Sequence, residues 1–525
     1  MGNLAVIDIV SLSPLAREPV FGGPSALERT LKWASELPEW QGTVLLAGRA
    51  DELPEGCQLI SGRPSASGGK LRALVLDKWN EEELVRALMS AAAESFGETD
   101  APAEALFFMR GDSALPDTQT SRVLWNLHYR YDAEYTFADG YPEGLVPQIL
   151  SVQLPARLLP LARGREGGVV RDSLFEILRQ DINAFDVETH LAPEDLRMER
   201  VSITCDTRRN RDIAEKLYAA GGVDAESLCR IIPENGRLLR SFPAYFPIQI
   251  TDYSPQSVSY CPFALKTDPR KGGSFMESSR FISLCERIID FAGDAVFSLS
   301  PAGEPAAHPD IENLIRGALK AGERAGNPPV SRVLVETSGI GWKDGVLESL
   351  AADYSGGRLM WILTMDASDE ELYRRIRGEG LEEAEASARR LHRLFGRNFY
   401  LQAVRMEENE EHLETFYRKW QDEGVQVIIQ KYNTFGGLLP NKQPADLSPL
   451  KRFPCWHLKR DMPVMLDGTV PVSWVRTQWD KPAWNVFTHS LEEIWAAGET
   501  LYQQHVNGEY PGSCGACDEY YTFNF

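Results

Sequence analysis

Two cysteines near the end of the chain have the spacing of a metal-binding pair. Cys514 and Cys517 are separated by one glycine and one alanine, and two thiolates at this spacing can bind one metal ion. The eight cysteines are spread over 525 residues, which is not the pattern of a disulfide framework, and a reducing compartment keeps such residues as thiols. By itself the pair fits a metal site, and it equally fits an incidental structural pair.

Polar and glycine residues follow several strand-like runs in the middle of the chain. Gly303, Glu304 and Pro305 follow one run, Ser338 follows the next, and Asp366 follows the one after that. The carboxyl ends of parallel strands meet at one edge, where α/β proteins bind their ligands. We therefore predict a cofactor-binding edge here. The alternative is that these strand ends are polar only because loops begin there.

These runs alternate with amphipathic helical stretches and lack hairpin signals, which predicts a parallel sheet covered by helices. The expected strands are 247–252, 295–300, 332–337, 359–366, 399–406 and 425–432, and the expected helices are 277–291, 309–325, 369–395 and 410–421. Residues 246–445 are thus expected to form a partial TIM-like barrel of the (β/α)6 type.

Residues 1–158 predict a separate α/β unit, with strands at 4–10, 43–47, 72–76 and 105–109 and helices at 25–35 and 81–93. The last of these strands leads to Asp112. A carboxylate in that position can bind a divalent metal and a nucleotide phosphate, or it can simply be a turn residue. The first strand is followed by a segment without glycine, so the phosphate-binding loop expected there is missing.

The chain is therefore predicted to be a multidomain α/β protein. Residues 159–245, with helical stretches at 172–180 and 211–219, are expected to form a connecting subdomain. Residues 446–525 are expected to form a small C-terminal domain, which contains three of the eight cysteines. Small segments with little regular structure often use a metal in place of a large core.

The overall charge narrows the range of partners. A formal net charge of −21 without a basic patch excludes nucleic acid and anionic membranes. No apolar run reaches the roughly 18 residues that span a bilayer, and the N-terminus lacks a signal-peptide pattern. We expect a cytoplasmic protein with an unknown peptide, protein or small-molecule partner.

Several fragments together resemble the radical SAM/SPASM proteins, and in particular the spiro-SPASM group. The segment Ser298 to Asp310 is similar to the family's Gly-Gly-Glu-Pro segment, which contacts the amino group of S-adenosylmethionine, with Ala302 in place of the first glycine. Glu336-Thr-Ser-Gly339 is similar to its Glu-Thr-Asn-Gly, and Met365 to Gly378 resembles its fourth strand and following helix.

The resemblance places Ser257 to Ala264 at the family's C-x-x-x-C-x-x-C loop, which holds a [4Fe-4S] cluster. Only Cys261 is present there, since Ser257 and Ala264 occupy the other two cysteine positions. Neither a hydroxyl nor a methyl group replaces a thiolate ligand of iron. The standard cluster is therefore predicted to be lost, and binding of S-adenosylmethionine without radical cleavage is the most that the barrel would retain.

The end of the chain resembles a shortened SPASM domain, with Ser473 where the family has a cysteine. The resemblance implies that Cys455, Cys514 and Cys517 could hold a [4Fe-4S] cluster with an unusual fourth ligand. They could instead hold Zn(II) with His457, or no metal at all.

The N-terminal unit resembles a GT-A nucleotidyltransferase domain. Phe21 to Leu31 is similar to the segment that opens its second helix, and Arg110-Gly-Asp112 to its metal-binding strand end. Residues 135–145 would line its cleft.

Three hypotheses follow. The preferred one is a radical SAM/SPASM homologue that has lost its standard cluster and acts as a binding or scaffold protein, with an auxiliary metal site at the C-terminus. The second is an active iron-sulfur enzyme that uses the C-terminal cluster. The third is a nucleotidyl or sugar-nucleotide transferase that uses Asp112 with Mg(II) or Mn(II).

Overall fold

The computed structural model describes residues 2–60, 70–94, 96, 103–165, 167–265, 268–299, 301–323, 329–446, 452–473 and 484–518. The described chain divides into two compact units, and the main division falls after Ser241. None of the helices in these ranges combines the length and the apolar character needed to cross a membrane.

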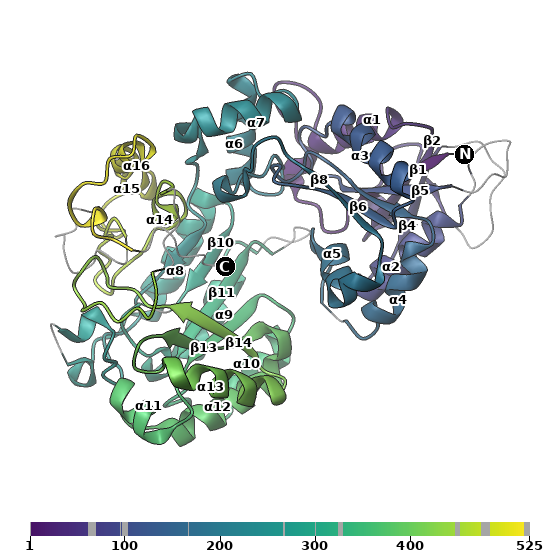
Figure 1. The fold of residues 1–525 in the computed structure, drawn as a ribbon. Helices are drawn as coiled ribbons and strands as arrows, with labels where there is room; N and C mark the ends of the chain where they lie inside the picture. The colour runs from purple at the N-terminus through teal and green to yellow at the C-terminus, as the bar shows by residue number, and fades with distance from the viewer. Residues whose placement is uncertain are drawn as a thin grey trace. The chain divides into compact units, whose positions relative to one another are not determined.

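The first unit is built on a mixed sheet (Figure 1). Over the described residues its strand order is β3-β4-β2-β1-β5-β7-β6-β8. The strands are β1 (Asn3–Asp8), β2 (Trp40–Ala47), β3 (Gln58–Leu59), β4 (Leu71–Val75), β5 (Ala105–Arg110), β6 (Tyr135–Asp139), β7 (Gln148–Ser151) and β8 (Val187–Leu191). β1 pairs in parallel with β2 and β5, whereas β7 is antiparallel to β5 and β6. The sheet is thus parallel at its centre and carries one reversed strand.

Helices cover both faces of this sheet. They are α1 (Ala26–Ser35), α2 (Glu81–Ala92), α3 (Thr118–Tyr131), α4 (Leu154–Ala162), α5 (Ser173–Leu178), α6 (Arg208–Ala219) and α7 (Ala225–Glu234). Alternate residues of a strand face opposite sides of its sheet. Because helices cover both sides here, β1 is buried along its whole length. Ala5 and Ile7 lie in one apolar core with α1, while Leu4 and Val6 lie in another with α2 and α4.

The expected strands and helices of the first unit are all present, with ends that differ by a few residues. The strands β3, β6, β7 and β8 and the helices α3, α4 and α7 were not predicted. β8 and the helices α5, α6 and α7 belong to the range expected to form a connecting subdomain. In the structure these residues pack within the first unit, where β8 pairs in parallel with β6.

The second unit contains a parallel sheet that confirms the predicted architecture (Figure 1). Over the described residues its strands lie in chain order, from β9 to β14. They are β9 (Tyr245–Pro247), β10 (Ala295–Ser298), β11 (Ser331–Thr337), β12 (Leu359–Thr364), β13 (Phe399–Arg405) and β14 (Gln426–Lys431). Every neighbouring pair is parallel. Helical crossovers between strands therefore leave all the carboxyl ends at one edge.

The helices of the second unit are α8 (Ser278–Ala292), α9 (Ile311–Lys320), α10 (Val346–Tyr354), α11 (Glu370–Ile376), α12 (Leu381–Phe395), α13 (Glu410–Asp422), α14 (Trp456–Arg460), α15 (Leu491–Ala497) and α16 (Glu499–Val506). The single helix predicted over 369–395 is wrong, because the chain forms α11 and α12 instead. Gly378 and Gly380 separate them at φ of 100° and 108°, a backbone region that helices do not use and glycine enters easily.

β9 is shorter than predicted, and residues 461–464 of the C-terminal segment pair in parallel with it and with the residue that follows it. The Met462 amide donates to the Tyr245 carbonyl over 3.0 Å, and the Val464 amide donates to the Pro247 carbonyl over 2.8 Å. Val464 also lies in the same apolar core as the sheet. The described part of the C-terminal segment is thus packed into the second unit's core.

Candidate functional site

Glu304 lies at the carboxyl edge of the second unit's sheet and is held by donors from its own chain. Its Oε2 accepts hydrogen bonds from the amide and the hydroxyl of Ser338, each over 2.7 Å. Its Oε1 accepts from the Thr337 hydroxyl and from the Ala306 amide. Burial raises the pKa of the Glu304 carboxyl, and these hydrogen bonds offset part of the rise. The structure thus brings Glu304 and Ser338 together, and their side chains are hydrogen-bonded to each other.

Gly303 and Pro305 fix the position of this carboxylate. A Cβ at Gly303 would lie 2.2 Å from the carbonyl oxygen of Thr251, so only glycine lets the two backbones approach this closely. Pro305 is buried and begins the short 3-10 helix η8 (Pro305–Ala307), and Ala302 has a φ of 59°. The segment therefore has a constrained backbone, as a ligand-binding loop or a rigid structural turn requires.

Asp366 is the centre of a buried polar network at the same edge. Its Oδ2 accepts from the Tyr260 hydroxyl and from Arg377 Nη1, both over 2.7 Å, and its Oδ1 accepts from the Val404 amide over 2.8 Å. The Asp366 carbonyl accepts from Asn409 Nδ2 over 3.0 Å. Asp366 also has a φ of 70°, a strained value for a residue with a side chain.

The cysteine loop is connected to α11 through this network. Arg377 Nε donates to Gln256 Oε1 over 3.2 Å, and Gln256 Nε2 donates to the Tyr373 hydroxyl over 2.9 Å. Burial, and then the neighbouring Asp366 carboxylate, raise the pKa of Tyr260, which keeps it a neutral donor. The loop is therefore anchored by Gln256 and Tyr260.

Cys261 follows Tyr260 directly. Its amide donates to the Val258 carbonyl over 3.1 Å, in a tight turn. Burial raises the pKa of the thiol of Cys261, which is the only cysteine of this loop. One thiol, with Ser257 and Ala264 at the other two positions, does not fit a [4Fe-4S] cluster.

The C-terminal cysteines lie in one region of the second unit. Burial, and then the neighbouring thiols of Cys517 and Cys514, raise the pKa of Cys455 to about 12. The Cys517 amide donates to the Cys514 carbonyl over 3.3 Å. His457 is bonded to Asp461, with its Nδ1 2.5 Å from Asp461 Oδ2. The described residues contain no group of three or more His, Cys, Asp or Glu placed to hold a metal ion.

In the first unit, Asp112 lies between two arginines. Its Oδ1 accepts from Arg171 Nη2 over 2.8 Å, and its Oδ2 lies 3.4 Å from Arg110 Nε. Arg110 also donates from Nη1 to the buried Asp8 over 3.0 Å. Two guanidiniums already supply positive charge to Asp112, so these residues do not fit a divalent cation at this carboxylate.

The sequence analysis missed several residues of these networks, among them Tyr260, Arg377 and Arg171. Arg377 stands inside the segment that resembles the family's fourth strand and helix, so the sequence carried a signal for it. Arg171 is 59 residues from Asp112, and its spacing gave no indication of the contact.

The fold and this edge define a two-unit α/β protein whose second unit carries an all-parallel sheet with buried polar groups at the described strand ends. No family model matches the chain. An uncharacterized protein of Treponema pallidum (strain Nichols) is 37% identical over 366 residues, which cover 67% of this chain and 98% of that protein. The chain therefore belongs to the same family as this Treponema protein.

Other comparisons gave shorter or weaker likenesses. A second uncharacterized Treponema pallidum protein is 36% identical over 112 residues, which cover 21% of this chain and 51% of that protein. Streptococcus suis SuiB is 13% identical, with a TM-score of 0.42 over 56% of this chain and 74% of its own. BtrN in complex with AdoMet and 2-DOIA is 15% identical, with a TM-score of 0.35 over 53% of this chain and 94% of its own. Structural likenesses of this size do not define an activity.

Proposed function

We propose that the second unit is a radical SAM/SPASM-type domain that has lost its standard cluster and now serves as a binding or scaffold domain. The main support is the set of hydrogen bonds at the sheet edge. The carboxylates of Glu304 and Asp366 each accept several hydrogen bonds from donors within the chain. A carboxylate bonded in this way is already stabilised by the fold, and turning it toward a ligand would leave buried donors unsatisfied.

The lone thiol of Cys261 supports the same proposal. A [4Fe-4S] cluster of this type needs several thiolates from the loop, and the loop offers one cysteine. The chemistry that the cluster would supply, one-electron cleavage of S-adenosylmethionine, is thus not part of the proposed function. The proposed partner is a peptide, a protein or a small molecule, because a net charge of −21 opposes binding to polyanions. The proposed setting is the cytoplasm.

The C-terminal cysteines are the proposed auxiliary metal site. Cys517 and Cys514 lie close enough to Cys455 to raise its pKa, and a bound cation is one way to stabilise several thiolates in a buried place. This site is also what the alternative of an active iron-sulfur enzyme would depend on.

Metal and sulfide analysis of the full chain after anaerobic reconstitution tests the proposal. We expect Cys261→Ala to keep the metal content of the wild type and Cys514→Ala to lose whatever metal is bound. Cys57→Ala, a partly buried cysteine of the first unit, is the matched control. We expect none of the four proteins to release 5′-deoxyadenosine from S-adenosylmethionine under reducing conditions.

Two results would count against the proposal. Iron that is lost in Cys261→Ala would mean that the loop holds a cluster after all. Release of 5′-deoxyadenosine that depends on Cys261 would establish radical chemistry and make the chain an active enzyme.

The transferase alternative makes a different demand. It requires Mg(II)-dependent nucleotide binding that is lost in Asp112→Asn. The two guanidiniums bonded to Asp112 argue against a metal ion there, and we expect titration with UTP and Mg(II) to give no saturable binding.

A further inference from the structure

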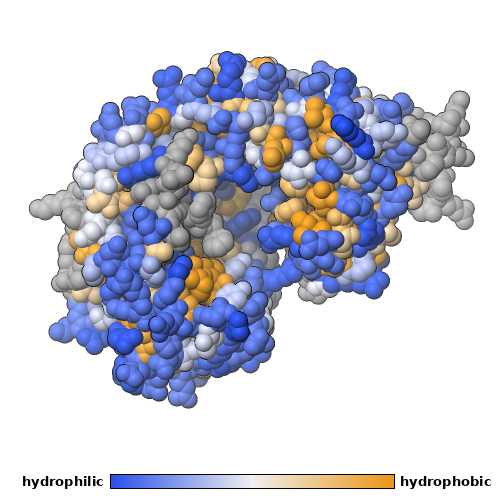
Figure 2. Space-filling model, viewed as in Figure 1, coloured by the Kyte–Doolittle hydropathy of each residue, from blue (hydrophilic) through white to orange (hydrophobic). Residues whose placement is uncertain are grey.

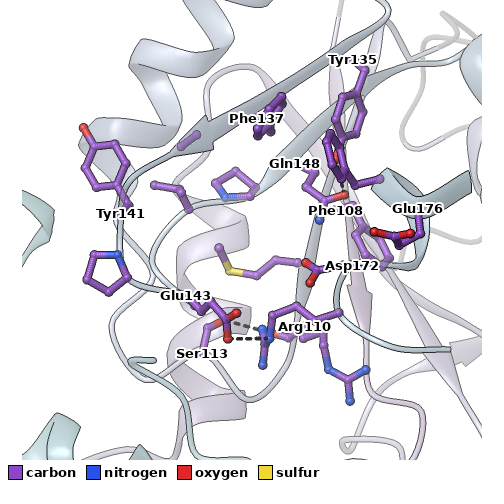
Figure 3. A pocket seen from close by; sticks show the side chains of 18 residues that line it. Phe108, Arg110, Ser113, Tyr135, Phe137, Tyr141, Glu143, Gln148, Asp172 and Glu176 are labelled. Carbon is purple, nitrogen blue, oxygen red and sulfur yellow. Dashed lines mark hydrogen bonds and ion pairs between the residues drawn. The ribbon is translucent and has the colours of Figure 1, made fainter. Parts of the chain in front are cut away.

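The first unit contains a pocket of about 380 Å³, lined in part by residues 135–145, and the function proposed for the second unit does not use it. It is formed by β5, β6 and β7, by the loop that joins β6 to β7, and by α5 (Figure 3). Arg171 and Asp172, which directly precede α5, also line it. Its size lies within the range of about 300 to 1,000 Å³ that is typical of small-molecule sites. All its lining residues belong to the first unit.

Aromatic side chains form one part of the pocket wall. The ring centroids of Tyr135 and Phe137 are 5.7 Å apart, and those of Phe137 and Phe175 are 5.3 Å apart. The Tyr135 hydroxyl donates to Gln148 Oε1 over 2.9 Å, so it already has a partner within the fold. Figure 2 shows hydrophobic residues gathered over the area of β6 and α5, within a mostly hydrophilic surface. The pocket wall therefore includes aromatic side chains, a kind of surface that apolar and cationic groups contact favourably.

Buried carboxylates compensate the positive charges of the two arginines that line the pocket. Arg110 is paired with Asp8 and Asp112, and Arg171 is paired with Asp112. Asp8 and Asp112 are both essentially inaccessible to solvent. Two guanidiniums and two buried carboxylates cancel in charge, so this group does not attract an anion strongly into the pocket.

Three further carboxylates then decide the sign of the pocket's potential: Glu143, Asp172 and Glu176. Glu143 accepts from the Ser202 hydroxyl over 2.9 Å and lies 3.9 Å from Arg171 Nε. Glu176 pairs with Arg179 on the surface, and solvent weakens that pair. Within the described part of the chain, the Asp172 carboxylate takes part in no hydrogen bond or ion pair; it is exposed.

We propose that this pocket binds a small organic cation, an ammonium or guanidinium group carried on an apolar or aromatic body. The aromatic rings would pack against the body and attract the cation through their faces, as rings do for ammonium ligands. Asp172 and Glu143 would supply the negative charge. The inference is independent of the second unit and of its proposed function.

Three ligands of nearly the same shape test the proposal on the full chain: benzylammonium, benzyl alcohol and benzoate, which differ chiefly in charge. We expect titration calorimetry or ligand-observed NMR to show saturable binding of benzylammonium, binding of benzyl alcohol that is roughly ten-fold weaker, and still weaker binding of benzoate.

Variants then separate the charge from the rings. Asp172→Asn should weaken benzylammonium binding several-fold and leave benzyl alcohol binding unchanged, because the substitution keeps shape and removes charge. Asp181→Asn removes an exposed carboxylate of the same unit outside the pocket and should change neither. Phe137→Leu should weaken both ligands, with far-UV circular dichroism to confirm that the variant folds.

Each opposite result would overturn the proposal. Failure of benzylammonium to saturate, equal or tighter binding of benzoate, or an Asp172→Asn protein that binds benzylammonium like the wild type would show that the pocket does not select a cation.

Discussion

At the scale of single residues, the same kind of side chain has different surroundings in the two units. Asp366 and Asp112 both follow strands, and both are bonded to arginine. Asp366 also accepts from a tyrosine and a backbone amide, so its network ties a loop to a helix. Breaking a buried pair of this type by removing one partner costs about 3–5 kcal/mol, which makes such networks structural anchors as well as candidate ligand sites.

Residue chemistry also predicts a pH effect in the first unit. Burial lowers the pKa of His128 to about 4, although Asp132 raises it slightly, and its Nδ1 lies 2.8 Å from Thr136 Oγ1. As the pH falls below about 6.5, the unfolded chain takes up a proton at this residue and the folded chain does not. We expect the free energy of unfolding to fall between about pH 6.5 and pH 4, by about 3 kcal/mol for this residue.

Urea denaturation at several pH values measures this effect. His128→Asn, which keeps a polar atom near Thr136, should lose stability less steeply with falling pH than the wild type. His412→Asn, at an exposed histidine of the second unit, should follow the wild-type profile. Equal slopes for wild type and His128→Asn would show that His128 does not cause the loss.

At the scale of elements, the edge of the second sheet depends on close packing between strand ends and loops. The segment after β10 lies directly on the backbone that follows β9, and Gly303 makes this approach possible. The amide of Glu304 also donates to the Tyr253 carbonyl over 2.8 Å. The position of the Glu304 carboxylate is thus set by two neighbouring segments and not by its own loop alone.

A single methyl group tests this arrangement. Gly303→Ala should lower the free energy of unfolding by about 1–3 kcal/mol, because the new Cβ meets the Thr251 carbonyl and the backbone must move. Gly356→Ala, in the same unit, adds its methyl group to open space and should change stability by about 0.5 kcal/mol or less. Urea midpoints that are the same for the two variants would contradict the close packing.

At the scale of the whole molecule, the apolar cores of the two units are separate: the first unit has one on each face of its sheet, and the second has its own. Leu106 belongs to a core of the first unit and Leu363 to the core of the second, and both are fully buried. Domains with separate cores generally unfold as separate cooperative units.

Calorimetry should therefore show two thermal transitions. Leu106→Ala should lower one transition and Leu363→Ala the other, because each creates a cavity worth about 2–5 kcal/mol in one core. If both variants shift one shared transition, the two units unfold together and this prediction is wrong.

Much of the fold was predictable because hydrophobic periodicity is local. The strands of the second sheet were predicted to within a few residues, except that β9 begins earlier and ends sooner, where residues 462–464 extend its pairing. The break between α11 and α12 was visible in principle as two glycines. β3, β6, β7 and β8, which are short and partly exposed, were missed.

The sequence by itself determined the alternation of strands and helices, the polar residues at the strand ends and the single thiol at Cys261, since each of these depends on residue type and on spacing along the chain. Only the tertiary structure decided that Arg377 and Tyr260 meet at Asp366, that Arg171 meets Asp112, and that Asp172 and Phe175 join side chains from residues 135–145 around one pocket in the first unit. These contacts join residues from separate elements, and the packing of those elements, which no local spacing records, brings the side chains together.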